Sequence, residues 1–355
     1  MQRFEVNKSA FGEHRMSDVP KANLAEGEVR VAVDFFAFTA NNMTYAAAGY
    51  SLGYWQFFPV GDDDNYGVIP VWGFADVVES RADDVAVGTR LFGYFPPAKH
   101  LVMLPIHVDN KSLFDGSEHR QSLPPLYNRY QRVKPGAPAK AEQLQALLGP
   151  LYNTSYCLWD QLQDNNYYDS EQILLLSASS KTSIGLAKAL ADDDKAPTVI
   201  GITSSGNLEF VNTLHYYDSA EEYGAMRNIA KIPTVVVDMA GNAHTAQALR
   251  EHLGDSLKYF ISVGLTHWDQ ADPQLDSRRE RHEWFFAPSY ILERSKAMAP
   301  GEFVRKSQAF VMAAAADASR WLSLQKLGGI AAFSEAYPAI CAGAMNPAQG
   351  LICKL

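Results

Sequence analysis

The chain has 355 residues, of which 47% are hydrophobic and 20% are charged, and this length and apolar content are typical of two folded domains. A formal net charge of −9 argues against general affinity for nucleic acid or for anionic membranes, because both are bound mainly through Lys and Arg. Three scattered cysteines match neither a disulfide framework nor the spacing of a structural zinc site.

The first part of the chain, residues 1–110, is rich in predicted strands. It begins without an apolar signal core, and no apolar run approaches the roughly 20 residues that span a bilayer, so we expect a soluble, cytoplasmic protein. The predicted strands cover residues 28–38, 70–79, 89–94 and 100–104. Short strands at this spacing are typical of a small barrel-like domain. The polar, tyrosine-rich stretch 39–58 predicts a loop with a short helix.

The next segment, residues 109–135, is polar and interrupted by prolines, which predicts an insertion followed by a hinge. Its basic side chains are compatible with a binding face, but we favour a solvated loop. These side chains are Arg120, Arg129, Arg132 and Lys134.

From residue 140 onward, strand and helix patterns alternate, which indicates a parallel sheet. The predicted strands cover residues 172–177, 198–203, 216–217, 233–238 and 257–263. The predicted helices cover residues 140–148, 154–162, 183–190, 207–214, 220–230, 244–253 and 308–327. Charged residues 265–282 predict a loop over the edge of the sheet, and residues 350–355 predict a closing strand. Asp238, at the end of a predicted strand, is interpreted as a brace for neighbouring loops.

The stretch Gln172–Leu190 reads as a buried strand, a polar turn and a helix. A helix start presents unpaired N–H groups and a partial positive charge, so it can hold a phosphate. The side chains that would add hydroxyl donors and one positive charge are Ser179, Ser180, Lys181, Thr182 and Ser183. The alternative is that they only cap the helix, where Ser and Thr are favoured. Gly185 is the single glycine here, so the usual glycine-rich fingerprint is missing.

The order of several motifs resembles the medium-chain dehydrogenase/reductase superfamily, in particular its zinc-free quinone oxidoreductase and enoyl reductase branch. The run TVIGITSSGNLEFVNTLHYYDSAEEY resembles that family's second and third strands, and PTVVVDMAG resembles its fourth. EVRVAVDFFAFTANNMTYAAAG resembles the start of the family pattern, and AYPAICAGAMNPAQGLICKL resembles its end. The match covers most of the chain outside residues 109–135 and 265–285, and it looks like a divergent branch of uncharacterised function.

The resemblance implies an α/β protein of two domains. A GroES-like β-barrel catalytic domain would combine residues 1–135 and 286–355, and a Rossmann domain with a doubly wound parallel sheet would span residues 136–285. A dinucleotide would bind at the carboxyl ends of the parallel strands. The family resemblance also suggests a homodimer.

The function implied is a zinc-independent, NADP(H)-dependent oxidoreductase that transfers hydride to a small-molecule substrate, either a carbonyl compound or an activated C=C of the quinone or enone kind. Besides the turn at 179–183, the implied cofactor-binding residues are Thr154, Ser204, Ser205, Val263 and Gly264. The turn after the second strand, residues 203–207, carries no Asp or Glu for the ribose hydroxyls, which favours NADP over NAD.

The resemblance also implies catalytic roles for Asn41 and Tyr50, with Tyr50 offset by one residue from the family's acid tyrosine. Tyr45 and Tyr54 compete for that role, and the alternative for each is a packed aromatic loop. No metal is expected, because Thr39 and Gly73 stand where the zinc enzymes of this superfamily carry ligands.

A second function remains open. The altered turn is compatible with a catalytically inactive dinucleotide-binding or scaffold protein that has kept the fold. A hydrolase is not supported, because the sequence contains no G-x-S-x-G motif, and the Lys-Thr pair at 181–182 lacks the glycines of a nucleotide-binding P-loop.

Overall fold

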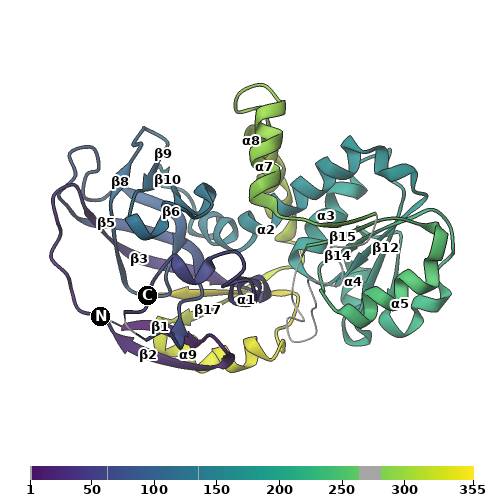
Figure 1. The fold of residues 1–355 in the computed structure, drawn as a ribbon, viewed down its shortest axis with the longest axis horizontal. Coiled ribbons are helices and arrows are strands. Elements are labelled where there is room, and N and C mark those ends of the chain that lie inside the picture. The colour runs from purple at the N-terminus through teal and green to yellow at the C-terminus, as the bar shows by residue number, and fades with distance from the viewer. Residues whose placement is uncertain (1, 62, 135, 264–280) are drawn as a thin grey trace. The chain divides into compact units, whose positions relative to one another are not determined.

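The computed structural model describes residues 2–61, 63–134, 136–263 and 281–355 (Figure 1). The chain forms two compact units: unit 1 comprises Met1–Leu147 and Ser323–Leu355, and unit 2 comprises Leu148–Leu322. The sequence analysis places the domain boundaries at 135/136 and 285/286, whereas the compact units divide inside helix α2 (Ala139–Asp164) and directly before strand β17. None of the helices in the described ranges is long and apolar enough to cross a membrane.

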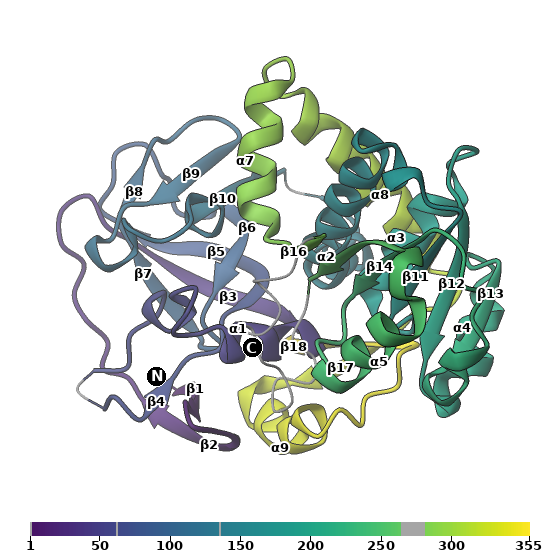
Figure 2. The same cartoon turned by 45° about the vertical axis from the view of Figure 1, so that its right-hand side comes forward.

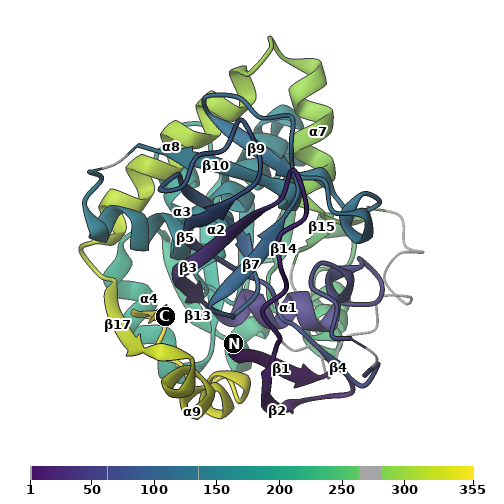
Figure 3. The same cartoon turned by 90° about the vertical axis from the view of Figure 1, so that its left-hand side faces the viewer.

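Unit 1 is built around a nine-stranded sheet that is mostly antiparallel (Figure 3). Its strand order is β17-β18-β3-β5-β6-β10-β9-β8, and β7 also pairs with β3. The strands are β3 (Val29–Phe38), β5 (Val71–Ser80), β6 (Arg90–Phe95), β7 (His100–Met103), β8 (Pro105–Ile106), β9 (Ser112–Asp115), β10 (Arg129–Val133), β17 (Ser323–Gly328) and β18 (Gln349–Lys354). The four N-terminal strands predicted from the sequence are confirmed, with ends that differ by at most one residue.

A smaller sheet and the helices α1 and α9 also belong to unit 1. The sheet has the order β2-β1-β4, with β1 at Gln2–Asn7, β2 at Ala10–Asp18 and β4 at Tyr66–Gly67. Helix α1 spans Ala40–Ala47 and helix α9 spans Gly329–Cys341. The short helix predicted within residues 39–58 is therefore confirmed as α1.

Two sequence predictions fail in this unit because distant pairing decides the outcome. Residues 109–135 are not an irregular insertion, since they supply β9 and β10, and β10 pairs with β6. Arg120 is completely buried rather than solvated, and its guanidinium donates to Asp115 Oδ2 at 2.7 Å and to Asn128 Oδ1 at 2.9 Å. A buried cation of this kind requires such partners.

The single helix predicted over residues 308–327 is also wrong. Helix α8 (Glu302–Ala318) ends first, and residues 323–328 form β17, which pairs in parallel with β18 at the end of the chain. That partner lies more than 20 residues away in sequence, so local periodicity could not reveal it.

Unit 2 contains a six-stranded parallel sheet with the order β13-β12-β11-β14-β15-β16. This is the 3-2-1-4-5-6 order of a doubly wound Rossmann sheet, as predicted. The strands are β11 (Gln172–Leu176), β12 (Thr198–Thr203), β13 (Ser219–Glu222), β14 (Thr234–Asp238), β15 (Leu257–Ser262) and β16 (His282–Trp284). The third strand was predicted at 216–217 and the following helix at 220–230. The strand prediction is wrong, because β13 begins at Ser219 and both Tyr216 and Tyr217 pack into the core. The predicted helix is confirmed only in part, since β13 takes its first residues and the 3-10 helix η6 (Tyr223–Asn228) follows.

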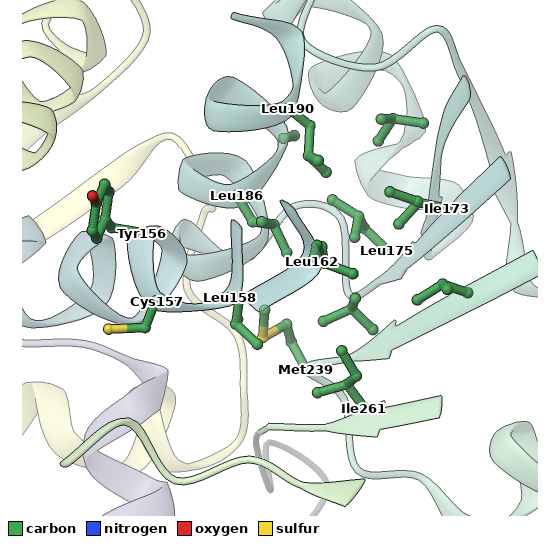
Figure 4. Packing of buried hydrophobic residues seen from close by; sticks show 14 of the residues in the cluster. Tyr156, Cys157, Leu158, Leu162, Ile173, Leu175, Leu186, Leu190, Met239 and Ile261 are labelled. Atoms are coloured by element: carbon green, nitrogen blue, oxygen red, sulfur yellow. The ribbon is translucent and has the colours of Figure 1, made fainter. Parts of the chain in front are cut away.

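Helices cover both faces of this sheet (Figure 2). The side chains of β11 alternate. Ile173 and Leu175 pack on the face covered by α2 and α3 (Figure 4). Leu174 and Leu176 pack on the face covered by α5. The helices are α2, which is continuous rather than the predicted pair, α3 (Lys181–Ala191), α4 (Leu208–Leu214), α5 (Ala243–Leu253), α7 (Ala287–Ala297) and α8. Two-sided burial explains why β11 is wholly apolar.

Candidate functional site

The turn between β11 and α3 gathers hydroxyl groups at the carboxyl end of the first strand of the sheet. Ser180 is the N-cap of α3, and its hydroxyl oxygen accepts the N–H of Ser183 at 3.3 Å. The buried Ser183 hydroxyl donates to the carbonyl oxygen of Leu176 at 3.0 Å. The capping interpretation is therefore confirmed for Ser180, and Ser183 ties the start of the helix to the end of the strand.

Ser179 differs from these two residues because it receives hydrogen bonds from the neighbouring turn. Its oxygen accepts from Thr203 Oγ1 at 3.3 Å and from Asn207 Nδ2 at 3.1 Å. A hydroxyl that accepts two hydrogen bonds still has its own proton to donate. Ser179, which is half-buried, is therefore a donor held in a fixed place at the end of the strand.

The first two residues of α3 complete this turn. Lys181 is half-buried, and the loss of solvation lowers the pKa of its ammonium to about 8. An anion beside this group would favour the protonated form. Thr182 is half-buried as well, and its carbonyl oxygen accepts the Ser155 hydroxyl at 2.8 Å. The turn thus combines a cation, hydroxyl groups and the N-terminus of an eleven-residue helix.

The close packing of α3 explains the one glycine in this stretch. A Cβ atom on Gly185 would lie 2.5 Å from Cδ1 of Tyr152 and 2.6 Å from Oγ of Ser155, both on α2. Only glycine allows the two helices to approach so closely. Gly185 therefore fixes the position of α3, although it does not itself face a ligand.

The turn after β12 carries the two other predicted hydroxyls, Ser204 and Ser205, and both are exposed. This turn contains no acidic residue, but β13 brings one beside it, because Glu222 pairs with Thr203 in the parallel register. Paired residues of adjacent strands point to the same face of a sheet. The sequence analysis missed Glu222 because it placed the third strand three residues too early.

The remaining predicted cofactor residues are dispersed. The Thr154 hydroxyl donates to the carbonyl oxygen of Pro150 within α2 at 3.2 Å. The backbone N–H of Val263 donates to the carbonyl oxygen of Asp238 at 2.9 Å. The carboxylate of Asp238 accepts the N–H groups of Ala240 and Gly241, at 2.7 and 3.0 Å, and so braces a loop as predicted. Gly264 lies outside the described residues.

Unit 1 contains a second group of functional candidates, which we call the phenol cluster. Its members are Tyr45, Tyr54, Trp72, Tyr94 and Tyr127, from α1, η1 (Tyr54–Gln56), β5, β6 and η3 (Pro125–Asn128). The ring centroids of neighbouring members lie 4.7 to 6.3 Å apart, for example 4.8 Å between Tyr45 and Tyr54 and 4.7 Å between Tyr94 and Tyr127. Edge-on and tilted contacts at this distance stabilise aromatic clusters.

Tyr45 is the member that lies beside the predicted catalytic residue Asn41. The indole N–H of Trp72 donates to the Tyr45 hydroxyl oxygen at 3.2 Å. Burial raises the pKa of the Tyr45 phenol to about 12, while hydrogen bonds from Trp72 and Asn41 act in the opposite direction. The indole N–H donor thus favours the phenolate that burial disfavours.

The other phenols of the cluster are held neutral. The hydroxyl groups of Tyr54 and Tyr127 are 2.8 Å apart and share a hydrogen bond. Burial raises the pKa of both groups above that of an ordinary tyrosine, and it raises the pKa of Tyr94 well above that value. Within the described ranges, the Tyr94 hydroxyl is buried without a hydrogen-bond partner.

Tyr50 lies apart from this cluster. Its side chain is 72% exposed, and its ring centroid lies 5.9 Å from the Nζ atom of Lys8. The structure therefore brings Asn41 together with Tyr45 rather than with Tyr50. In the described part of the chain, no group of three or more His, Cys, Asp or Glu side chains is arranged to hold a metal ion.

Comparison with known sequences and structures identifies a family and a similar fold for this chain. Residues 36–346 match the family model described as "Protein of unknown function (DUF2855)". No curated protein matches the sequence. Quinone oxidoreductase from Escherichia coli, solved with NADPH, aligns over 100% of both chains with a TM-score of 0.61 and 11% identity.

Two further solved structures align with the whole of this chain. CurA from Vibrio vulnificus, solved with NADPH, aligns over 100% of this chain and 99% of its own, with a TM-score of 0.59 and 13% identity. The yhdH oxidoreductase from Salmonella enterica, solved with NADP, aligns over 100% of both chains with a TM-score of 0.55 and 11% identity. The fold is thus that of the medium-chain dehydrogenases/reductases, with a GroES-like domain and a Rossmann domain.

Proposed function

We propose that this chain, which belongs to the DUF2855 family of proteins of unknown function, is a reductase that uses NADP(H) to transfer hydride to a carbonyl or to an activated C=C. The observation that carries the proposal is the turn at Ser179–Lys181, where a fixed hydroxyl donor and a cation stand at the start of α3. This start lies at the carboxyl end of the first strand in a 3-2-1-4-5-6 sheet, the place where Rossmann folds hold a pyrophosphate. Quinone oxidoreductase and CurA, which share the fold, were solved with NADPH.

The donor set of the turn fits a pyrophosphate in its chemistry. Ser179 and Thr182 offer hydroxyls, Lys181 offers a charge, and the helix start offers backbone N–H groups. Ser204 and Ser205 would contact the adenosine ribose, and Thr154 with the backbone of Val263 would contact the nicotinamide. When bound, the dinucleotide supplies the hydride.

We further propose that the reaction proceeds without zinc. Thr39, directly after β3, and Gly73, within β5, stand where the zinc enzymes of this superfamily place ligands, and neither residue offers a thiolate, imidazole or carboxylate. Reduction then needs a proton donor from the protein. A phenol within a low-dielectric environment can donate a proton to a developing enolate or alkoxide.

We assign the proton donor to Tyr45 in place of Tyr50, with Asn41 beside it. Tyr45 is fixed by hydrogen bonds, whereas Tyr50 is an exposed side chain next to Lys8. A general acid must be held within hydrogen-bond reach of the atom that it protonates, which an anchored side chain achieves better than a mobile one.

Titration of the protein with NADPH and NADH, followed by nicotinamide fluorescence, tests the proposal. We expect both to bind, with NADPH binding more tightly. The absence of binding at millimolar concentrations of either would contradict it. Oxidation of NADPH, measured by absorbance with a panel of quinones, enones and aldehydes, then identifies the substrate class.

A second candidate function is a dinucleotide-binding scaffold without turnover. The observation that favours it is that Ser180 and Ser183 use their hydroxyls for the helix cap and for the strand end, so the glycine-free turn has fewer groups left for a ligand. Binding of NADPH without oxidation across the whole panel would support the scaffold. The family resemblance further suggests a homodimer, and light scattering coupled to size exclusion measures that state.

A further inference from the structure

We propose that the indole N–H of Trp72 holds the oxygen of Tyr45 as its hydrogen-bond donor, with the side chain of Asn41 on the same face of α1, so that Trp72 acts as a positioning residue for the proton donor. This inference rests on the proposed function, because it takes Tyr45 to be the acid of the reduction. The contacts on which the inference is based are all between residues of unit 1.

The direction of the hydrogen bond from Trp72 is fixed by chemistry. An indole nitrogen can only donate, so the Tyr45 oxygen is the acceptor in the 3.2 Å contact. The proton of Tyr45 itself is then left to point away from Trp72. A phenol held in this way presents its proton in one direction.

Trp72 is itself held in place by its neighbours on the sheet. Its ring stacks on Phe92 of β6, with centroids 5.6 Å apart and an interplanar angle of 29°, and it contacts Tyr94 at 5.2 Å. Asn41 is placed by the anchored start of α1, where the backbone N–H of Thr39 donates to Asn42 Oδ1 at 2.8 Å and Asn42 Nδ2 donates to the carbonyl of Pro70 at 2.9 Å. The Trp72 donor is therefore preorganised, and Asn41 lies one helical turn before Tyr45 on α1.

The proton balance of the step is simple. A bound NADP(H) would supply the hydride, and the charge that develops on the substrate oxygen or carbon takes the proton from Tyr45. The O–H bond of Tyr45 breaks, the phenolate keeps the hydrogen bond from Trp72, and water returns a proton before the next turnover. This N–H donor stabilises the anion more than the neutral phenol, because charge-assisted hydrogen bonds are the stronger kind.

The remaining surroundings of Tyr45 supply little charge. The titratable groups that face it are the phenols of Tyr54, Tyr94 and Tyr127, all held neutral by burial. The buried Arg120 faces Tyr94 and is paired with Asp115 at 2.7 Å. The indole N–H of Trp72 is thus the main support for a phenolate at Tyr45.

The first experiment examines the hydrogen bond without any turnover. The indole N–H resonance of Trp72 is assigned by comparing the ¹H–¹⁵N spectra of the wild-type protein and Trp72→Phe, and is then followed in Tyr45→Phe. We expect this resonance to move while that of Trp159, which donates to Asp193 Oδ2 at 2.9 Å in unit 2, stays in place. An unmoved Trp72 resonance overturns the inference, whereas a wild-type protein that binds no dinucleotide overturns the proposed function instead.

The second experiment measures the consequence for catalysis. Trp72→Phe keeps an aromatic ring and removes the donor, so we expect kcat to fall by about 10-fold to 100-fold, as expected for one charge-assisted hydrogen bond, with KM for NADPH unchanged. The solvent deuterium isotope effect on kcat is expected to rise because proton transfer becomes slower. Trp72→His, which retains a ring N–H, restores part of the rate.

One control variant and one independent variant accompany Trp72→Phe. Trp159→Phe removes an indole donor elsewhere and is expected to leave kcat unchanged. Asn41→Asp puts a negative charge on the face of α1 that carries Tyr45, which disfavours a phenolate there even if Trp72→Phe fails to fold, and it is expected to lower kcat in the same way. Equal kcat and isotope effects in the wild type, Trp72→Phe and Asn41→Asp would refute the proposed role of Trp72.

Discussion

The two candidate regions differ in how they are built. The turn of unit 2 lies on one continuous stretch, Gln172–Leu190, and its hydroxyls bond mostly to groups within it and within the next turn. The phenol cluster of unit 1 takes its five members from five separate elements between residues 45 and 127. One short stretch of sequence can thus determine a turn that holds a ligand. The position of the proposed acid, Tyr45, depends instead on tertiary packing. The predictions below test each side of this contrast, beginning with the largest effect.

The strongest test of the cluster compares Tyr45→Phe with Tyr50→Phe. Loss of a positioned general acid costs about 10²-fold to 10⁴-fold in rate, so we expect Tyr45→Phe to reduce kcat by at least about 100-fold. Tyr50→Phe removes a hydroxyl from a side chain that is 72% exposed, and we expect kcat to change by less than about 2-fold. Steady-state kinetics with NADPH measures kcat for both variants. A large loss in Tyr50→Phe with little change in Tyr45→Phe would assign the acid role to Tyr50.

The contrast also explains what the sequence could predict. The strand, the turn and the helix of residues 172–190 are visible in the sequence because an apolar run, a polar cluster and helical spacing follow one another directly. Tyr45 could only be named as one competitor among three, because Trp72, its hydrogen-bond donor, is 27 residues away on β5. The motif order nevertheless predicted a Rossmann sheet, whose four inner strands β12, β11, β14 and β15 are mostly buried apolar segments.

The failures have the same origin. Arg120 looked like a loop residue because its partners, Asp115, Asn128 and Tyr130, become neighbours only when β9 and β10 join the sheet. Tyr217 resembled part of a strand, but its hydroxyl donates to the carbonyl of Ala178 at 2.7 Å and so secures the turn before α3. In each case a side chain was misread because its partners are brought to it only by the folding of other elements.

The position of the turn itself is expected to be sensitive to the packing of α3. Gly185→Ala would place a Cβ about 2.5 Å from Tyr152, and overpacking of this kind costs about 1–3 kcal/mol of folding free energy. Urea unfolding measures the loss. Gly206→Ala is the matched control, because a Cβ there meets no atom within 4 Å. Equal stability of the two variants would show that α3 shifts without cost.

Lys181 gives the turn a pH dependence that follows from the pKa of about 8 of its ammonium. An anionic ligand needs the protonated form, so NADPH affinity is expected to be highest below about pH 7 and to fall as the pH rises through 8. Arg remains charged throughout this range, so Lys181→Arg should flatten the profile. Isothermal titration calorimetry at a series of pH values measures both, and a flat profile for the wild type would remove Lys181 from the site.

Substitution of Lys181 also shows whether its ammonium contacts the 2′-phosphate of NADPH or the pyrophosphate of the dinucleotide. Lys181→Ala is expected to weaken NADPH binding by about 10-fold, the value of one charge-assisted contact, and to weaken NADH binding less. Equal losses would mean that Lys181 contacts the pyrophosphate, which both cofactors share. Unchanged binding of both would assign the turn to helix capping alone.

The smallest expected effect concerns Glu222, which the register of β13 places beside Thr203 and on the same side of the sheet. In a Rossmann fold, the end of the second strand is where the 2′-position of the adenosine ribose is read, and a carboxylate there repels a 2′-phosphate. Glu222 is exposed, so its charge is screened, and we expect Glu222→Gln to improve NADPH affinity by only about 2-fold to 4-fold without changing NADH affinity. Glu221→Gln removes the same charge from the opposite side of β13, where its partner is Ile202, and serves as the control. If both variants change NADPH binding equally, the effect comes from net charge alone; if Glu222→Gln weakens NADH instead, the carboxylate binds the ribose hydroxyls, and the turn would then favour NAD over NADP.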